Sequence, residues 1–194
     1  MKPAAAWLLV AVLALTSCGV PVQSDPVPLE PGTVPSQLRD GGSAPSPQPS
    51  TATGKSPLRV NFVRNDRLVS IRREAPAGAS AERLTTVIQD LVAGPTTTEQ
   101  ANGITTALPP NLNLTVAEVQ GSRVVLELSG DTEGRSATEN VLAVAQIVLS
   151  VTALPPFDEV TISRGGVPVE ALLADGALTT DPLTAADYAS LRSR

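Results

Sequence analysis

The sequence contains no histidine, a single cysteine and few aromatic residues. The lack of histidine excludes catalytic triads, dyads and proton relays built on imidazole, together with the usual histidine-containing zinc sites. One cysteine, Cys18, makes neither an internal disulfide nor a thiolate metal cluster. Because aromatic residues make up only 2% of the chain, platforms on which sugar rings stack are scarce. We therefore expect no metal and no cofactor.

Positive charge is also scarce, since 14 Lys and Arg face 19 Asp and Glu, for a formal net charge of −5. Nucleic-acid binding requires a basic surface that neutralises phosphates, so we expect no nucleic-acid partner. Lys55 is the only lysine beyond the N-terminal leader, which argues against serine–lysine catalysis. A glycosidase-like pair of carboxylates is the remaining enzymatic possibility. We expect a protein that is not an enzyme.

The N-terminus has the layout of a secretory signal peptide, with Lys2, an apolar run over residues 4–15 and then Thr16-Ser17-Cys18. The run is shorter than the roughly 20 residues that a spanning helix needs. The segment ending at Cys18 resembles the bacterial lipobox, which implies that Cys18 carries diacylglycerol and that cleavage falls before it. The alternative is an ordinary signal peptide with a stray thiol. We expect an extracytoplasmic protein that is attached to the cell membrane through the lipid on Cys18.

The segment after Cys18 is dominated by Pro, Ser, Thr and Gly up to Pro57. Such a segment buries too little apolar surface to offset its ordering entropy, so we expect a disordered spacer. A proline-rich docking motif is the alternative, although no basic PxxP core is present. The expected organisation is a signal peptide over 1–17, the lipidated cysteine and tether over 18–57, and a folded domain over 58–194, with its core in 58–170 and a tail in 171–194.

Within the folded part, alternating and helical apolar patterns predict an α+β domain. Ser80 is the expected N-cap of the first helix, and Gly94-Pro95 is its expected end. The short hairpins predict a mostly antiparallel sheet of four to five strands, packed with two helices in the order ββαββαβ. The expected strands are 58–63, 68–71, 112–116, 124–128, 160–162 and an edge strand at 167–169; the expected helices are 80–92 and 138–153, with a short extra turn at 96–101.

Four segments resemble the GerMN domain, which occurs in spore-germination proteins and in actinobacterial envelope lipoproteins. They are VNFVRNDRLVSIRRE (60–74), DLVAGPTTTEQANGITTALPP (90–110), VVLELSG (124–130) and VLAVAQIVLSVTALPPFDEVTI (141–162). The marked excess of arginine over lysine is typical of GC-rich actinobacterial proteins. The resemblance implies a module for protein–protein assembly in the cell envelope, and it supplies no catalytic residue.

Four residues stand out as structural. Gly94 and Pro95 fit a helix C-terminus better than a binding loop. Gln146 is the one amide on an apolar helix face, and we expect it to hold a nearby loop backbone rather than a ligand. Thr152 is expected to bond a carbonyl of its own helix.

Arg64, Arg67, Arg72 and Arg73 form the one local concentration of positive charge that the sequence predicts. They are candidates for contact with an acidic partner, an anionic wall polymer or lipid headgroups. The alternative is a solvated hairpin with local ion pairs of little energetic weight.

Two functions therefore compete. The first is a lipid-anchored interaction or assembly module with an envelope protein partner, such as a sensor-kinase ectodomain or an assembling complex, in sporulation or germination. The second is a binding module for a small molecule or a cell-wall fragment; a wall hydrolase is nearly excluded. An interaction module presents an exposed apolar or charged patch, whereas a ligand module needs a concave pocket with converging polar groups.

Overall fold

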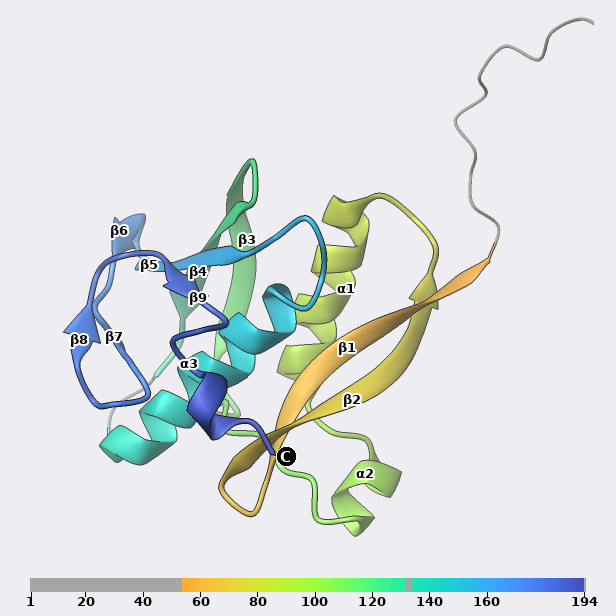
Figure 1. Cartoon of the computed structure of the whole chain (residues 1–194), viewed down its shortest axis with the longest axis horizontal. Helices are drawn as coiled ribbons and strands as arrows, with labels where there is room; N and C mark the ends of the chain where they lie inside the picture. The colour runs from red at the N-terminus through yellow and green to blue at the C-terminus, as the bar shows by residue number, and fades with distance from the viewer. Residues whose placement is uncertain (1–53, 132–133, 194) are drawn as a thin grey trace, which may run out of the picture. The chain divides into compact units, whose positions relative to one another are not determined.

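The computed structural model describes residues 54–131 and 134–193 (Figure 1). The predicted signal peptide, Cys18 and nearly all of the predicted tether lie outside the described residues. The described part is an α+β domain, as the sequence predicts. Within it, no helix has the length and apolar character needed to cross a membrane.

The first two strands form a long antiparallel hairpin that is a two-stranded sheet of its own. Strands β1 (Lys55–Arg64) and β2 (Arg67–Pro76) are joined by the predicted turn. Asn65 and Asp66 both have positive φ, 51° and 55°, which their short polar side chains tolerate better than most. The strands extend well beyond the predicted 58–63 and 68–71.

Helix α1 (Ser80–Ala93) packs on this hairpin with the apolar face that its sequence predicts. The expectation that Ser80 is the N-cap is wrong, because Ala79 is the N-cap and makes no side-chain cap bond. Ser80 is the first helical residue, and its hydroxyl donates to the Pro155 carbonyl at 3.4 Å. Gly94 ends α1 with φ 77°. A short helix α2 (Thr97–Ala101) follows.

The second sheet has the order β3-β4-β5-β6, with β9 also paired to β5. The predicted hairpin turn joins β3 to β4 in antiparallel pairing. In contrast, β4 and β5 run parallel, because α3 makes the crossover that parallel strands require. The sheet is therefore mixed. Its strands are β3 (Asn113–Gln120), β4 (Arg123–Ser129), β5 (Glu159–Arg164), β6 (Val167–Pro168) and β9 (Leu183–Thr184).

Helix α3 (Ala137–Val151) lies at the centre of the domain, between the hairpin and the sheet (Figure 1). Ser136 and Glu139 form a capping box at its start. Every residue from Ala145 to Val151 is buried, as expected for a helix that is apolar nearly all round. It begins one residue before and ends two residues before the predicted 138–153.

The C-terminal segment is integrated into the core. It forms the strands β7 (Ala171–Leu172) and β8 (Leu178–Thr179), then β9 and a 3₁₀ turn at Ala189–Leu191. Tyr188 is fully buried, and its hydroxyl donates to the Leu172 carbonyl at 2.9 Å. Burial, with a smaller contribution from the charge of Asp187, raises the pKa of Tyr188. The segment predicted as a tail thus closes one side of α3.

Candidate functional site

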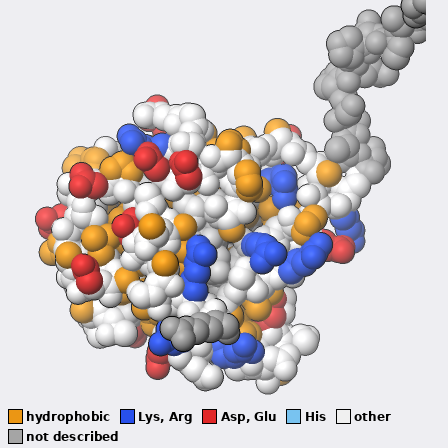
Figure 2. Space-filling model, in the orientation of Figure 1, with side chains coloured by type: hydrophobic (Ala, Val, Ile, Leu, Met, Phe, Trp, Pro, Cys, Tyr) orange, Lys and Arg blue, Asp and Glu red, His pale blue; other side chains and the backbone are white. Residues whose placement is uncertain are grey.

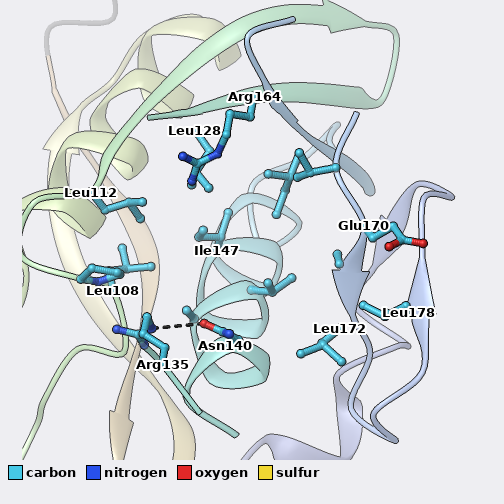
Figure 3. Close-up of a pocket in the computed structure, with 16 residues that line it drawn as sticks. Leu108, Leu112, Leu128, Arg135, Asn140, Ile147, Arg164, Glu170, Leu172 and Leu178 are labelled. Atoms are coloured by element: carbon cyan, nitrogen blue, oxygen red, sulfur yellow. Dashed lines mark hydrogen bonds between the residues drawn. The ribbon is translucent and has the colours of Figure 1, made fainter. Parts of the chain in front are cut away.

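A mostly apolar hollow of about 360 Å³ lies beside α3, between the sheet and the β7–β8 hairpin (Figure 3). The crossover helix forms its floor, and the C-terminal strands form one wall. The hollow exists because the segment after β5 folds back over α3. Its apolar lining includes Leu108 and Leu112 from the loop before β3, Leu128 from β4, Ile147 from α3, Ile162 from β5 and Leu172 from β7.

Four polar side chains line the same hollow: Arg135, Asn140, Arg164 and Glu170. Arg135 is held from several directions. Its guanidinium donates to the carbonyls of Ala107 and, at 3.2 Å, Glu139, and its Nε donates to the Asn140 amide oxygen at 3.2 Å. Figure 3 shows this last bond at the lower end of the hollow. The bonds fix a positive charge at the mouth of an apolar cavity.

Arg164 is fixed at the opposite end of the hollow (Figure 3). Its guanidinium donates to the Gly130 carbonyl at 3.0 Å. The neighbouring Glu127 accepts the Ser163 hydroxyl at 2.7 Å and the backbone N–H groups of Gly165 and Gly166. These bonds, the Ser163 bond first, and the charge of Arg164 hold the pKa of Glu127 below its ordinary value. The turn after β5 is thereby tied to β4.

The composition of the lining indicates which kind of ligand this hollow suits. Its lining combines aliphatic side chains with two guanidinium groups, one amide and one carboxylate. Such a set suits an apolar ligand with a polar or anionic end. In residues 54–131 and 134–193, no three Asp or Glu side chains gather in a group that could hold a metal ion.

The sequence-predicted structural residues lie at the ends of α1 and α3 or within α3, and none of them lines this hollow. The backbone N–H of Gly94 donates to the carbonyls of Asp90 and Leu91, and Pro95 is buried directly after it. Gln146 is fully buried; its side-chain oxygen accepts the Ala107 N–H at 2.8 Å, and its side-chain nitrogen donates to the Thr106 hydroxyl at 3.0 Å. The Thr152 hydroxyl donates to the Val148 carbonyl at 2.7 Å.

The four arginines predicted as one basic group are not together. Arg72 and Arg73 are adjacent in β2, so their side chains leave opposite faces of the hairpin. Arg73 is mostly buried and pairs with Asp90 at 3.2 Å and Glu99 at 2.7 Å. Its guanidinium also lies 5.0 Å from the centre of the Phe62 ring. Arg73 therefore has a structural role, in which it joins β2 to α1 and α2, and it is not available for the predicted contact with a partner.

Arg64 and Arg67 lie at the turn end of the hairpin, opposite each other in the strand register. Both are exposed, and Arg67 donates to the Ser190 carbonyl at 3.0 Å. Arg72 lies toward the other end, opposite Arg59. A second hollow there is lined by Arg59, Arg72 and Arg83.

Sequence reasoning missed Arg59 and Arg83, and it missed Arg135 and Arg164 at the apolar hollow. Two signals were available for the hairpin: strand alternation separates Arg72 from Arg73, and the register set by the Asn65-Asp66 turn places Arg59 opposite Arg72. Arg135 and Arg164 carry no such signal, because they meet the hollow only once the C-terminal strands fold over α3.

The described residues form a small α+β domain built on a central buried helix. The chain belongs to the Germane family, whose description is "Sporulation and spore germination" and whose model matches residues 51–170. No curated protein matches the chain.

Solved structures with the same fold include GerMN domains of the sporulation protein GerM from Bacillus subtilis. The tandem-domain structure has a TM-score of 0.51 and 18% identity, over 67% of this chain and 45% of that chain. The present chain thus spans about half of that structure. The first GerMN domain alone has a TM-score of 0.50 and 14% identity, over 66% of this chain and 97% of that one. A Clostridium perfringens protein described as a lipoprotein has a TM-score of 0.48 and 18% identity, over 72% and 94%.

Proposed function

We propose that this protein is a lipid-anchored, extracytoplasmic lipoprotein whose GerMN domain is a non-catalytic module for protein–protein assembly at the cell membrane. The family description favours a process related to sporulation or germination. The lipobox resemblance at Cys18 supports the anchor.

The outer edge of β3 is the observation that carries the assembly role. Among the described residues, this eight-residue strand pairs only with β4. A free edge of this length is a template on which a partner strand can add. Here the backbone supplies hydrogen-bonding groups for a partner.

A groove beside this edge supplies apolar contacts for the same partner strand. A hollow of about 560 Å³ lies between α1 and the first half of β3, and none of the residues that line it is charged. It includes Ile88 and Val92 of α1 and Leu114 and Val116 of β3. Val92 is 46% exposed, so an apolar surface is available there. The expected partner segment is an extended strand with uncharged side chains facing α1.

A lysine substitution at Val92 tests this assignment. Val92→Lys places a charge in the groove without touching the core, and a cation in the last turn of α1 is compatible with the helix dipole. Val167→Lys is the matched control, because Val167 is 64% exposed on β6. In crosslinked cells we expect the full-length V92K protein to lose its specific adducts and the V167K protein to keep them. Retention of the same adducts by both proteins would place the interface elsewhere.

The apolar hollow beside α3 favours a second candidate function, the binding of an aliphatic ligand with an anionic end. Ala143 lines this hollow and is partly exposed, so Ala143→Trp is expected to fill it. Native mass spectrometry of the full chain purified from its own membranes would detect an added ligand mass in the wild type that A143W lacks. Identical masses, apart from the substitution itself, would contradict this second function.

A further inference from the structure

A small hollow at the open end of the β1–β2 hairpin is lined by three arginines. It measures about 180 Å³, and Arg59, Arg72 and Arg83 share it with apolar residues from β1 and from the segment after α3. No carboxylate lines it. On a protein with net charge −5, this is a locally positive site. Figure 2 shows basic side chains gathered over the hairpin, whereas many of the acidic ones seen in that view lie on the other side of the domain.

Arg59 and Arg72 are direct cross-strand neighbours in the hairpin. Residues that face each other in this way have Cβ atoms about 4.5–5.5 Å apart, and like charges at that spacing repel. Both side chains are exposed. Within residues 54–131 and 134–193, neither has a hydrogen-bond or ion-pair partner. Their two charges are therefore uncompensated by the described part of the protein.

Arg83 brings a third guanidinium to the hollow from α1. One of its terminal nitrogens donates to the Pro57 carbonyl at 2.8 Å, which fixes the side chain across the base of the hairpin. Its Nε is buried and has no acceptor among the described residues. A buried donor without an acceptor is unfavourable.

Arg73, on the same hairpin, is a structural arginine with which these three can be compared. Its Nε is also buried without an acceptor, but its terminal nitrogens meet the carboxylates of Asp90 and Glu99. The charge of Arg73 is thus neutralised inside the fold. Within residues 54–131 and 134–193, Arg59, Arg72 and Arg83 form no ion pair with a carboxylate.

We propose that this hollow is a binding site for a phosphate group. Guanidinium groups pair with phosphate oxygens through paired, charge-assisted hydrogen bonds. A tetrahedral phosphate offers enough acceptors for three arginines, whereas a carboxylate offers two oxygens. The group can come from an anionic lipid headgroup or from a soluble or polymer-borne phosphate.

Two probes test the site in the full chain carrying Cys18→Ser, so that no lipid on that residue contributes to binding. The first is glycerol 1-phosphate, measured by its effect on the thermal unfolding midpoint. The second is a vesicle of phosphatidylcholine with phosphatidylglycerol, measured by co-sedimentation against vesicles of phosphatidylcholine alone. The variant is Arg59→Gln with Arg72→Gln. The matched control is Arg64→Gln with Arg67→Gln, which removes the same charge from the turn end of the same hairpin.

We expect R59Q/R72Q to weaken binding of the effective probe by about tenfold or more, the loss typical of charge-assisted hydrogen bonds. We expect R64Q/R67Q to bind nearly as the wild type does. A response to vesicles only assigns the site to lipid headgroups, and a response to glycerol 1-phosphate assigns it to soluble or polymer phosphate. Binding of neither probe, or equal losses in both double variants, would overturn the proposal. Removing the repulsion between Arg59 and Arg72 is not expected to unfold the protein, and far-UV circular dichroism checks this.

Discussion

Arg73 on β2 and Glu99 on α2 form an ion pair at 2.7 Å, with only 15% and 18% of their side chains exposed. The same guanidinium meets Asp90 of α1 and the Gly94 carbonyl at the end of that helix. One side chain thus connects the hairpin to the two helices that follow it. Glu99 is also the capping-box residue that accepts the Thr96 N–H at 2.7 Å.

Arg73→Gln is expected to destabilise the domain by about 2–4 kcal/mol, because it leaves two partly buried carboxylates without their cation. Arg72→Gln, one residue earlier and exposed, is the matched control and is expected to change stability by less than about 1 kcal/mol. Urea unfolding followed by circular dichroism measures both. Equal effects of the two substitutions would show that the Arg73 contacts carry no particular weight.

Protonation of Glu99 is expected to remove part of the same stabilisation. Burial alone raises the pKa of Glu99, but the hydrogen bonds and charge from Arg73 and the backbone bond from Thr96 outweigh it, so the pKa lies below its ordinary value of 4.5. A carboxyl whose pKa is depressed on folding stabilises the folded state above the unfolded-state pKa. This contribution is lost as the pH falls through the folded-state pKa.

Glu99→Gln isolates this contribution. We expect E99Q to be less stable than the wild type at pH 7, and the gap between the two proteins to narrow as the pH falls below about 4.5. Unfolding midpoints measured from pH 7 to pH 3 give the gap directly. A gap that stays constant over this range would mean that the ionised form of Glu99 contributes nothing.

The hairpin and the helices show which features of the structure can be predicted from the sequence. The strands, the turn, the helix ending at Gly94 and the buried α3 all follow from local patterns, and so does the α+β class. The prediction of a single basic patch on the hairpin is wrong, because arginines that are close in sequence do not share one face of a strand. Alternation along β2 separates Arg72 from Arg73, and the partners of Arg73 come from helices that follow in the chain.

Other features depend on contacts distant in sequence. The parallel pairing of β4 and β5 was missed because short hairpins on either side favoured antiparallel pairing, and only the crossover through α3 reverses the direction. Tyr188 lies in a segment with few apolar residues, yet it is fully buried against the strands around α3. The hollow beside α3 forms only when the C-terminal segment folds over this helix. Local sequence patterns therefore do not predict it.

Gln146→Leu is expected to destabilise the protein by about 1–3 kcal/mol. The leucine fits an apolar helix but leaves the Ala107 N–H, which Gln146 accepts at 2.8 Å, without its partner. Gln89→Leu on the exposed face of α1 is the control and is expected to be nearly neutral. Chemical denaturation measures the free energy of unfolding of both variants. An unchanged value for Q146L would show that water replaces the amide without loss of stability.

Cys18→Ala is expected to release the full-length protein from the membrane. If the lipobox resemblance is correct, the Cys18 sulfur is the acyl acceptor, and two or more acyl chains provide stable anchoring where one does not. Membranes washed with carbonate and probed for the protein give the answer, with Ser17→Ala as a control that keeps a small residue before the cysteine. Sedimentation of the C18A protein with washed membranes would contradict the lipoprotein assignment.

Charge reversal at the turn end of the hairpin tests whether an acidic partner contacts Arg64 and Arg67. Both residues are exposed and form no ion pair among the described residues, so Arg64→Glu with Arg67→Glu is expected to cost no more than about 1 kcal/mol of stability. If an acidic partner binds there, the double variant captures less of it from crosslinked, detergent-solubilised cells. The loss is expected to be larger at low salt, because the Debye length is about 10 Å at 0.1 M. Arg59→Glu with Arg72→Glu makes the same charge change at the other end of the hairpin and is expected to leave capture unchanged. Unchanged capture by a folded R64E/R67E protein would show that the partner does not bind at the turn end of the hairpin.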